Sequence, residues 1–153
     1  REDDSGRVHD AATAVLDAIG ETSPGAVPAI ALAGAWRLVA ELGFAPSLDQ
    51  CASCHADLAP NDALTFDHRA GGVLCDRCAR LGLRGRQLPA EARETLRCWL
   101  AGAESPLDDP SARRAHQRLL REFLEEHLGD GRPLRAFLTW EERLQAPLAA
   151  ARQ

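Results

Sequence analysis

At 153 residues, the chain is long enough for one domain with a substantial core or for two small ones. Its 45% hydrophobic and 27% charged residues are ordinary for a soluble globular protein, and its net charge of −5 excludes a uniformly basic, histone-like coat. Met is absent, even at position 1, so we expect the chain to be a fragment or a processed piece of a longer protein.

The charge is distributed unevenly along the chain. Residues 1–68 carry 3 Arg against 11 acidic residues, residues 69–121 carry 11 against 6, and residues 122–153 carry 4 against 6. All 18 basic residues are Arg, whose guanidinium groups can make forked contacts to phosphate or carboxylate. The basic middle predicts a localised anion-binding surface, with solvated side chains and i,i+4 ion pairs as the alternative explanation.

Two helices are predicted in the first part of the chain. Apolar residues recur at helical spacing over 6–20, and the segment over 27–42 is apolar nearly all round, which indicates a buried helix that ends at Gly43 and Pro46. The apolar run is too short to span a bilayer, and no signal peptide is visible, so we expect no membrane association.

Residues 47–88 lack a long helical period but contain a strand-like run over 63–66 and a turn at Gly71 and Gly72. Helices are predicted again over 88–102, where Pro89 suits the first helical position, over 109–129, where Asp109 suits the N-cap, and over 133–144. The 109–129 helix has an apolar stripe of Ala112, Ala115, Leu119 and Phe123, with Leu120 and Leu124 beside it. The tail over 146–153 is predicted to fray. The predicted fold is mainly α: one helical domain over 1–153 with an inserted, zinc-ribbon-like four-cysteine module over about 47–88.

The module contains two Cys-x-x-Cys pairs, Cys51 with Cys54 and Cys75 with Cys78, separated by 20 residues. This spacing is typical of one structural zinc ion held by four thiolates, which leave no open position for a catalytic water. The alternatives are a redox dithiol, which usually lies in a βαβ unit that is not visible here, and a vestigial site. Four of the five cysteines lie in such pairs, which is not the usual pattern of a secreted disulfide framework. The pattern therefore indicates a reducing, cytoplasmic compartment.

Other residues that could act in chemistry have simpler explanations. We expect His55, which directly follows Cys54, to be a turn or surface residue, and His68 to be exposed. Cys98 is expected to be a small buried hydrophobic residue. The three Trp residues lie on predicted helices and are expected in the core. No nucleophile–base pair, phosphate-cradling glycine loop or open metal site is visible in the sequence, so we expect that the protein is not an enzyme.

The order of motifs in "LVAELGFAPSLDQCASC" and "FDHRAGGVLCDRC" resembles the C-terminal region of the bacterial RecO (recombination protein O) family. Sequences of that family contain, in this order, an apolar helix, a helix end of the form Leu-Gly-aromatic-x-Pro, a Cys-x-x-Cys pair, an aromatic residue followed by Gly-Gly, and a second Cys-x-x-Cys pair. The matching residues here are Leu42, Gly43, Phe44, Pro46, Cys51, Cys54, Phe66, Gly71, Gly72, Cys75 and Cys78. The resemblance covers about residues 8–145, and His55 departs from it, because the family usually has Gly there.

The resemblance implies a DNA repair and homologous recombination mediator of the RecFOR pathway. The family binds and anneals single- and double-stranded DNA, partners RecR, and helps load RecA onto strands coated by single-stranded DNA-binding protein. It joins an N-terminal OB domain, absent from this chain, to a helical domain with a zinc module. A cytoplasmic, nucleoid-associated location is expected. The alternative is a zinc-stabilised scaffold that contacts only proteins.

The candidates for binding DNA, or the acidic tail of single-stranded DNA-binding protein, are basic residues of the chain's middle: Arg77, Arg80, Arg84, Arg86, Arg93, Arg97, Arg113, Arg114, Arg118 and Arg121. The last four crowd the first half of the 109–129 helix, while three Glu residues crowd its second half, which opposes the helix dipole. Ion pairs between Arg118 and Glu122 and between Arg121 and Glu125 are expected to recover only about a few tenths of a kcal/mol each.

Overall fold

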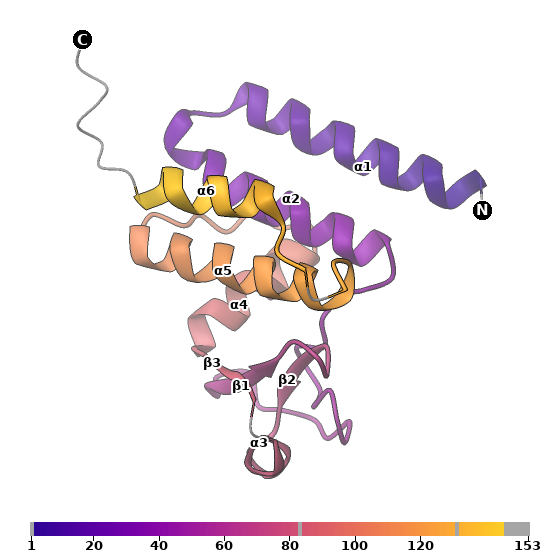
Figure 1. The fold of residues 1–153 in the computed structure, drawn as a ribbon, viewed down its shortest axis with the longest axis vertical. Helices are drawn as coiled ribbons and strands as arrows, with labels where there is room; N and C mark the ends of the chain where they lie inside the picture. The colour runs from indigo at the N-terminus through magenta and orange to yellow at the C-terminus, as the bar shows by residue number, and fades with distance from the viewer. Residues whose placement is uncertain (1, 83, 131, 146–153) are drawn as a thin grey trace.

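The computed structural model describes residues 2–82, 84–130 and 132–145, with side chains described between residues 4 and 143 of those ranges. The tail over 146–153, predicted to fray, lies outside the described residues. Within the described part, α-helices and one small sheet make up the fold, which confirms the predicted mainly α class (Figure 1). No helix there combines the length and apolar character needed to cross a membrane.

Helix α2 (Val27–Glu41) is the central helix of the bundle. Helix α1 (Glu2–Glu21) packs along α2, and the short 3-10 turn η1 (Pro24–Ala26) connects the two helices. Gly34 permits this close approach, because a Cβ atom at that position would lie 2.5 Å from both methyl carbons of Val15.

The C-terminal helices pack against α2 and against one another. Helices α4 (Ala90–Leu100) and α5 (Pro110–His127) both contact α2, and α6 (Arg135–Gln145) contacts α5. Asp109 is the N-cap of α5, as predicted, since its carboxylate accepts from the Ala112 N–H at 2.8 Å.

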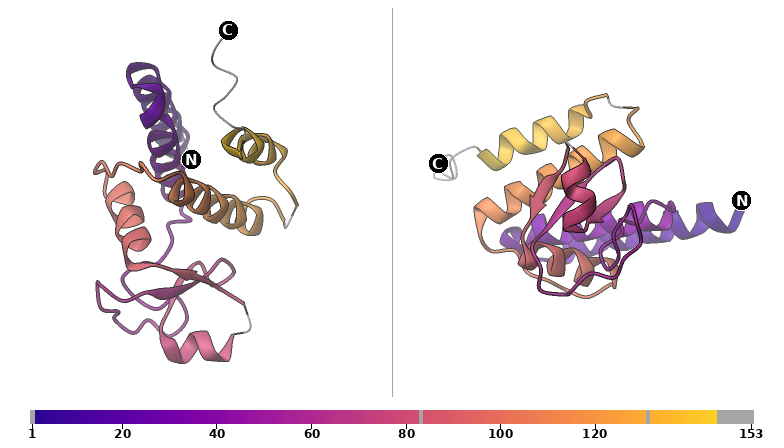
Figure 2. Two further views of the ribbon diagram at one scale, coloured as in Figure 1. Left: turned by 90° about the vertical axis from the view of Figure 1, so that its left-hand side faces the viewer. Right: turned by 90° about the horizontal axis from the view of Figure 1, so that it is seen from below.

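The inserted module forms a three-stranded antiparallel sheet of β1 (Leu64–Asp67), β2 (Gly72–Leu74) and β3 (Arg86–Leu88), in the order β2-β1-β3. The turn between β1 and β2 uses Gly71 at φ +83°, a left-handed conformation that glycine adopts easily. The short helix α3 (Asp76–Leu81) follows β2 and lies at the end of the molecule remote from α1 (Figures 1 and 2).

One continuous core joins the module to the bundle. The rings of Trp36 and Phe123 lie 5.1 Å apart between centroids, and Phe66 of β1 lies 6.1 Å from Phe123. Trp36 and Trp99 are 0% and 1% exposed, which confirms two of the predicted core tryptophans, while Trp140 packs half-buried at the edge of this core.

Three details of the predicted helices are wrong. Pro89 is the N-cap of α4 and not its first residue. The predicted stripe of α5 includes Ala115, which is exposed, and omits His116 and Gln117, which are 4% and 1% exposed. The stripe differs because the His116 ring packs edge-on against Trp99 of α4 at 5.0 Å, and the Gln117 amide donates to the Phe137 carbonyl of α6 at 3.4 Å.

Candidate metal centre

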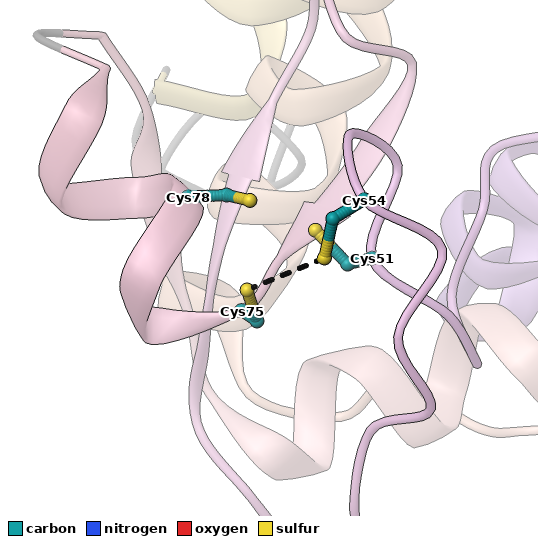
Figure 3. A group of neighbouring side chains, drawn as sticks. All are labelled: Cys51, Cys54, Cys75 and Cys78. Atoms are coloured by element: carbon teal, nitrogen blue, oxygen red, sulfur yellow. Dashed lines mark hydrogen bonds between the residues drawn. The ribbon is translucent and has the colours of Figure 1, made fainter.

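The four paired cysteines converge on one point at the edge of the sheet (Figure 3). Their sulfur atoms all lie within 4.8 Å of one another, and the sulfurs of Cys54 and Cys75 are 3.8 Å apart. A tetrahedron with metal–sulfur bonds of about 2.3 Å has edges of about 3.8 Å. The cluster therefore has the size that one four-coordinate metal ion requires.

Backbone hydrogen bonds position the first cysteine pair. The N–H of Cys51 donates to the carbonyl of Ala56 at 2.9 Å, and the N–H of Ala52 donates to the carbonyl of Val73 in β2 at 2.8 Å. The same loop begins at Ser47, which bridges to Gly72. An added Cβ on Gly72 would lie 2.2 Å from the Ser47 carbonyl oxygen, so the loop and the strand can meet only at a glycine.

The second pair belongs to α3. Cys75 is the N-cap residue of this helix and Cys78 lies in its first turn, so the helix points both sulfurs at the facing loop (Figure 3). The N–H of Ala79 donates to the Cys75 carbonyl at 2.9 Å and closes that turn.

His55 lies in the turn that closes the first pair, where it adopts a left-handed conformation with φ +62°. Its N–H donates to the Cys51 carbonyl at 2.9 Å, and its side chain is exposed. His55 does not belong to the cluster of possible ligands within the described residues. This placement confirms that it is a turn residue at the surface.

The thiols of the cluster differ in acidity. Burial by itself raises the pKa of Cys51, but hydrogen bonds from the backbone N–H groups of Cys54, Cys75 and Ser53 outweigh burial and lower the pKa to about 6. The side-chain hydrogen bond with Cys75 is the main cause that raises the pKa of Cys78 to about 12. Without a metal, Cys51 thus ionises more readily than Cys78, and a bound cation would favour the thiolate forms of its ligands.

One predicted anion-binding residue has a purely internal role. Arg93 is 1% exposed, and its guanidinium group donates to the carbonyl oxygens of Leu48, Ala59 and Pro60 on either side of the first cysteine pair. It cannot reach an external partner in this conformation.

Arg86 contacts Glu122 of α5, which also accepts from the Nε2 atom of His68 at 2.9 Å. His68 is therefore not exposed as predicted, since its side chain is only 18% exposed and burial lowers its pKa. The predicted Arg118–Glu122 pair is also wrong, because Glu122 turns towards the sheet and bonds Arg86 and His68 instead.

Three further arginines of the predicted set make internal contacts. Arg97 pairs with Asp49 and Glu94, Arg113 donates to the carbonyls of Leu107 and Gly25, and Arg121 pairs with Glu141 and Glu125. The predicted Arg121–Glu125 pair is thereby confirmed, at 3.4 Å. Cys98, expected to be buried, is only half-buried, and its thiol lies 3.7 Å from a Glu94 carboxylate oxygen.

The remaining candidates are exposed and make no ion pair within the described part of the chain: Arg77, Arg80, Arg84, Arg114 and Arg118. The structure thus separates the ten predicted arginines into five with internal contacts and five that are available to a partner. Sequence reasoning missed Glu122 as the link between sheet and bundle, and no local pattern around Glu122 could have indicated it.

Comparison with known proteins gives a consistent result. The family model for the recombination protein O C-terminal region matches residues 1–136. The DNA repair protein RecO of Anaeromyxobacter sp. is 38% identical over 101 residues, covering 63% of this chain and 39% of the relative. That of Myxococcus xanthus is 34% identical over 105 residues, covering 67% of this chain and 41% of the relative.

The chain thus spans about two fifths of the length of these relatives. No solved structure matches the chain significantly. The match to the family model extends over most of the sequence and includes both cysteine pairs and the helices that surround them. The chain therefore belongs to the recombination protein O family, to whose C-terminal region it corresponds.

Proposed function

We propose that the chain is the helical, zinc-bearing part of a mediator of DNA repair and homologous recombination. The observation that carries this proposal is the match to the recombination protein O C-terminal region over residues 1–136. In this role the protein is not an enzyme: it binds and positions other macromolecules. We take residues 1–153 as one helical domain that follows an OB domain outside this sequence.

The metal of this domain is one structural zinc ion, held by Cys51, Cys54, Cys75 and Cys78. Four soft thiolate donors in a tetrahedral cluster suit zinc, and a closed set of ligands suits a structural role. The ion would hold the first cysteine loop against α3. Metal analysis of the purified chain tests this assignment, with one zinc per chain as the expected result.

The partners follow from the family. Within the RecFOR pathway they are single- and double-stranded DNA, RecR, and the acidic C-terminal tail of single-stranded DNA-binding protein, and the outcome is loading of RecA onto coated strands. A cytoplasmic, nucleoid-associated location accords with these partners. The arginines available for DNA or an acidic partner are Arg77, Arg80, Arg84, Arg114 and Arg118.

The experiment is a fluorescence anisotropy titration of the zinc-loaded chain with a labelled single strand at low and high salt. Phosphate contacts predict binding at low salt that weakens steeply as salt is added, because binding releases condensed counterions. Absence of binding at low salt would favour the alternative, a zinc-stabilised scaffold that contacts only proteins.

A further inference from the structure

Exposed arginines lie along the zinc module, from α3, at the end of the molecule remote from α1, to the hairpin between β1 and β2, which contacts α5 (Figure 1). Arg80 lies in α3, and Arg84 lies just before β3. Arg69 comes from the hairpin between β1 and β2 and shares the lining of one open hollow of about 510 Å³ with Arg84. Glu122 and Glu126 of α5 line the same hollow. Arg69, Arg80 and Arg84 are called the tip arginines below, and the surface from α3 to the hollow is called the tip.

The acidic groups near the tip arginines are mostly occupied. Glu122 accepts from Arg86 and His68, and an oxygen of Asp67 accepts from the backbone N–H groups of Arg69 and Ala70. Among the described residues that line the hollow, Glu126 is the one carboxylate with no bonded partner. The tip arginines therefore remain available to an external anion.

Arg77 differs from the tip arginines. It lines a separate recess together with Asp57, Asp62 and Asp76, beside the cysteine cluster. A zinc ion with four thiolates carries a net charge of −2, so the cation of Arg77 is balanced locally. It is left out of the proposed surface.

The apolar group at the tip protrudes instead of forming a pocket. Leu81, the last residue of α3, is 81% exposed, and the hollow is lined by charged groups, His68 and a glycine. An acidic peptide with an apolar end needs an apolar pocket to bury that end. A single strand of nucleic acid instead offers unpaired base faces that a protruding apolar side chain can cover, and phosphates spaced for several guanidinium groups.

We propose that the tip of the zinc module binds single-stranded nucleic acid, with the tip arginines on phosphates and Leu81 against a base. This inference rests on the proposed function and assigns a place on the chain to its DNA contact. The module would then have two roles, since its metal orders the segment that carries the binding residues.

The test uses matched pairs of variants of the zinc-loaded chain in titrations with a labelled oligothymidylate at several salt concentrations. The double variant Arg80→Ala/Arg84→Ala is compared with Arg37→Ala/Arg135→Ala, which removes the same charge from exposed positions on α2 and α6. Loss of two phosphate contacts should lower the slope of log affinity against log salt by about 1.4 in the first variant and leave it unchanged in the second. Zinc content and helicity, measured for both, show that each variant is folded.

Leu81→Gln is compared with Leu16→Gln on α1, where the wild-type side chain is 68% exposed. The first should weaken binding by the same factor at every salt concentration, and the second should have no effect. Glu126→Gln should tighten binding, because it removes the one free negative charge of the hollow.

Several results would overturn the proposal. If wild type binds the strand and Arg80→Ala/Arg84→Ala binds it with the same affinity and slope, the tip is not the site, although the proposed function survives. An equal loss in the Arg37→Ala/Arg135→Ala variant would show that binding is not localised at the tip. Binding of an acidic, apolar-ended peptide that requires the tip arginines, without binding of the strand, would assign the surface to a protein partner. Absence of any strand binding by wild type would overturn this proposal and the DNA contact of the proposed function together.

Discussion

The Nε atom of Arg93 donates to the carbonyl oxygen of Leu48 at 2.7 Å, and this bond joins α4 to the loop that carries the first cysteine pair. The Nη1 atom of the same side chain donates to the carbonyls of Ala59 and Pro60, at 2.5 and 3.2 Å. Arg93 thus holds the loop at both ends, before Cys51 and after Cys54. No carboxylate pairs with this guanidinium group in the described part of the chain.

Replacing Arg93 should destabilise the protein strongly. Arg93→Ala leaves three carbonyl groups without their charged donor, and removing one partner of a buried charged interaction costs roughly 3–5 kcal/mol, so a loss of that size is expected. Urea unfolding measures the change in the free energy of unfolding. Arg80→Ala, at an exposed position, is the control and should stay within about 0.5 kcal/mol of wild type. Equal stability of the two variants would show that the bonds of Arg93 do not matter.

Removing the metal should unfold the module and then weaken the bundle. The contribution of zinc in small zinc peptides is about 10–16 kcal/mol of apparent binding free energy, more than a domain of this size can lose. Because Phe66 of the module lies in the same core as Trp36 and Phe123, loss of the module exposes these rings to water. Cys75→Ser, or a strong chelator added to wild type, should lower the melting temperature measured by circular dichroism.

Cys98→Ser is the control for that experiment, because Cys98 lies outside the cluster of four sulfurs. It should keep one zinc per chain and most of the thermal stability. An unchanged melting curve of wild type in excess chelator would refute a stabilising role of the metal.

The cluster of four cysteines was predictable from the sequence, and the contacts of the arginines were not. Two residues between paired cysteines suffice for a tight turn to present both sulfurs to one ion, so the ligand set follows from local spacing. The role of Arg93 depends on carbonyl groups more than 30 residues away in the sequence, which only the folded chain brings to it. Charge alone therefore could not tell Arg93, a buried structural residue, from the exposed Arg80.

The short elements of the module were missed for a similar reason. Strand β3 (Arg86–Leu88) has two exposed residues and one buried residue, too few for an alternating pattern. It exists because β1 pairs with it along one edge, and because Gly85 leaves room for Thr65, whose methyl carbon would lie 2.3 Å from an added Cβ. Helix α3 (Asp76–Leu81) was missed as well, because its six residues are too few for a helical period. The five longer helices had longer periods and were predicted in the right order.

His116 should make stability depend on pH. It is 4% exposed, and burial lowers its pKa from 6.5 to about 4. The unfolded chain therefore takes up a proton at this residue as the pH falls below about 6.5, while the folded chain stays neutral until about pH 4, so stability decreases over that window. Between pH 7.5 and 5.5 the loss from His116 alone should be about 1.3 kcal/mol.

The variant His116→Phe isolates that effect, because it keeps an aromatic ring against Trp99 and cannot titrate. The difference in the free energy of unfolding between wild type and variant should change by about 1.3 kcal/mol between the two pH values, and effects of pH on the metal cancel in this difference. A difference that is constant with pH would show that folding does not lower the pKa of His116.

His55→Gly should stabilise the metal-loaded chain without changing its zinc content. The backbone of His55 has φ +62°, a left-handed conformation that costs a residue with a Cβ roughly 1–2 kcal/mol and costs glycine little. The greater freedom of glycine in the unfolded chain offsets part of this gain, so an increase of about 0.5–1 kcal/mol is expected. His55→Val is the opposing control and should destabilise, because a β-branched side chain fits this conformation poorly. Loss of zinc from His55→Gly would instead identify His55 as a ligand, against the exposed position that it occupies beside Cys54.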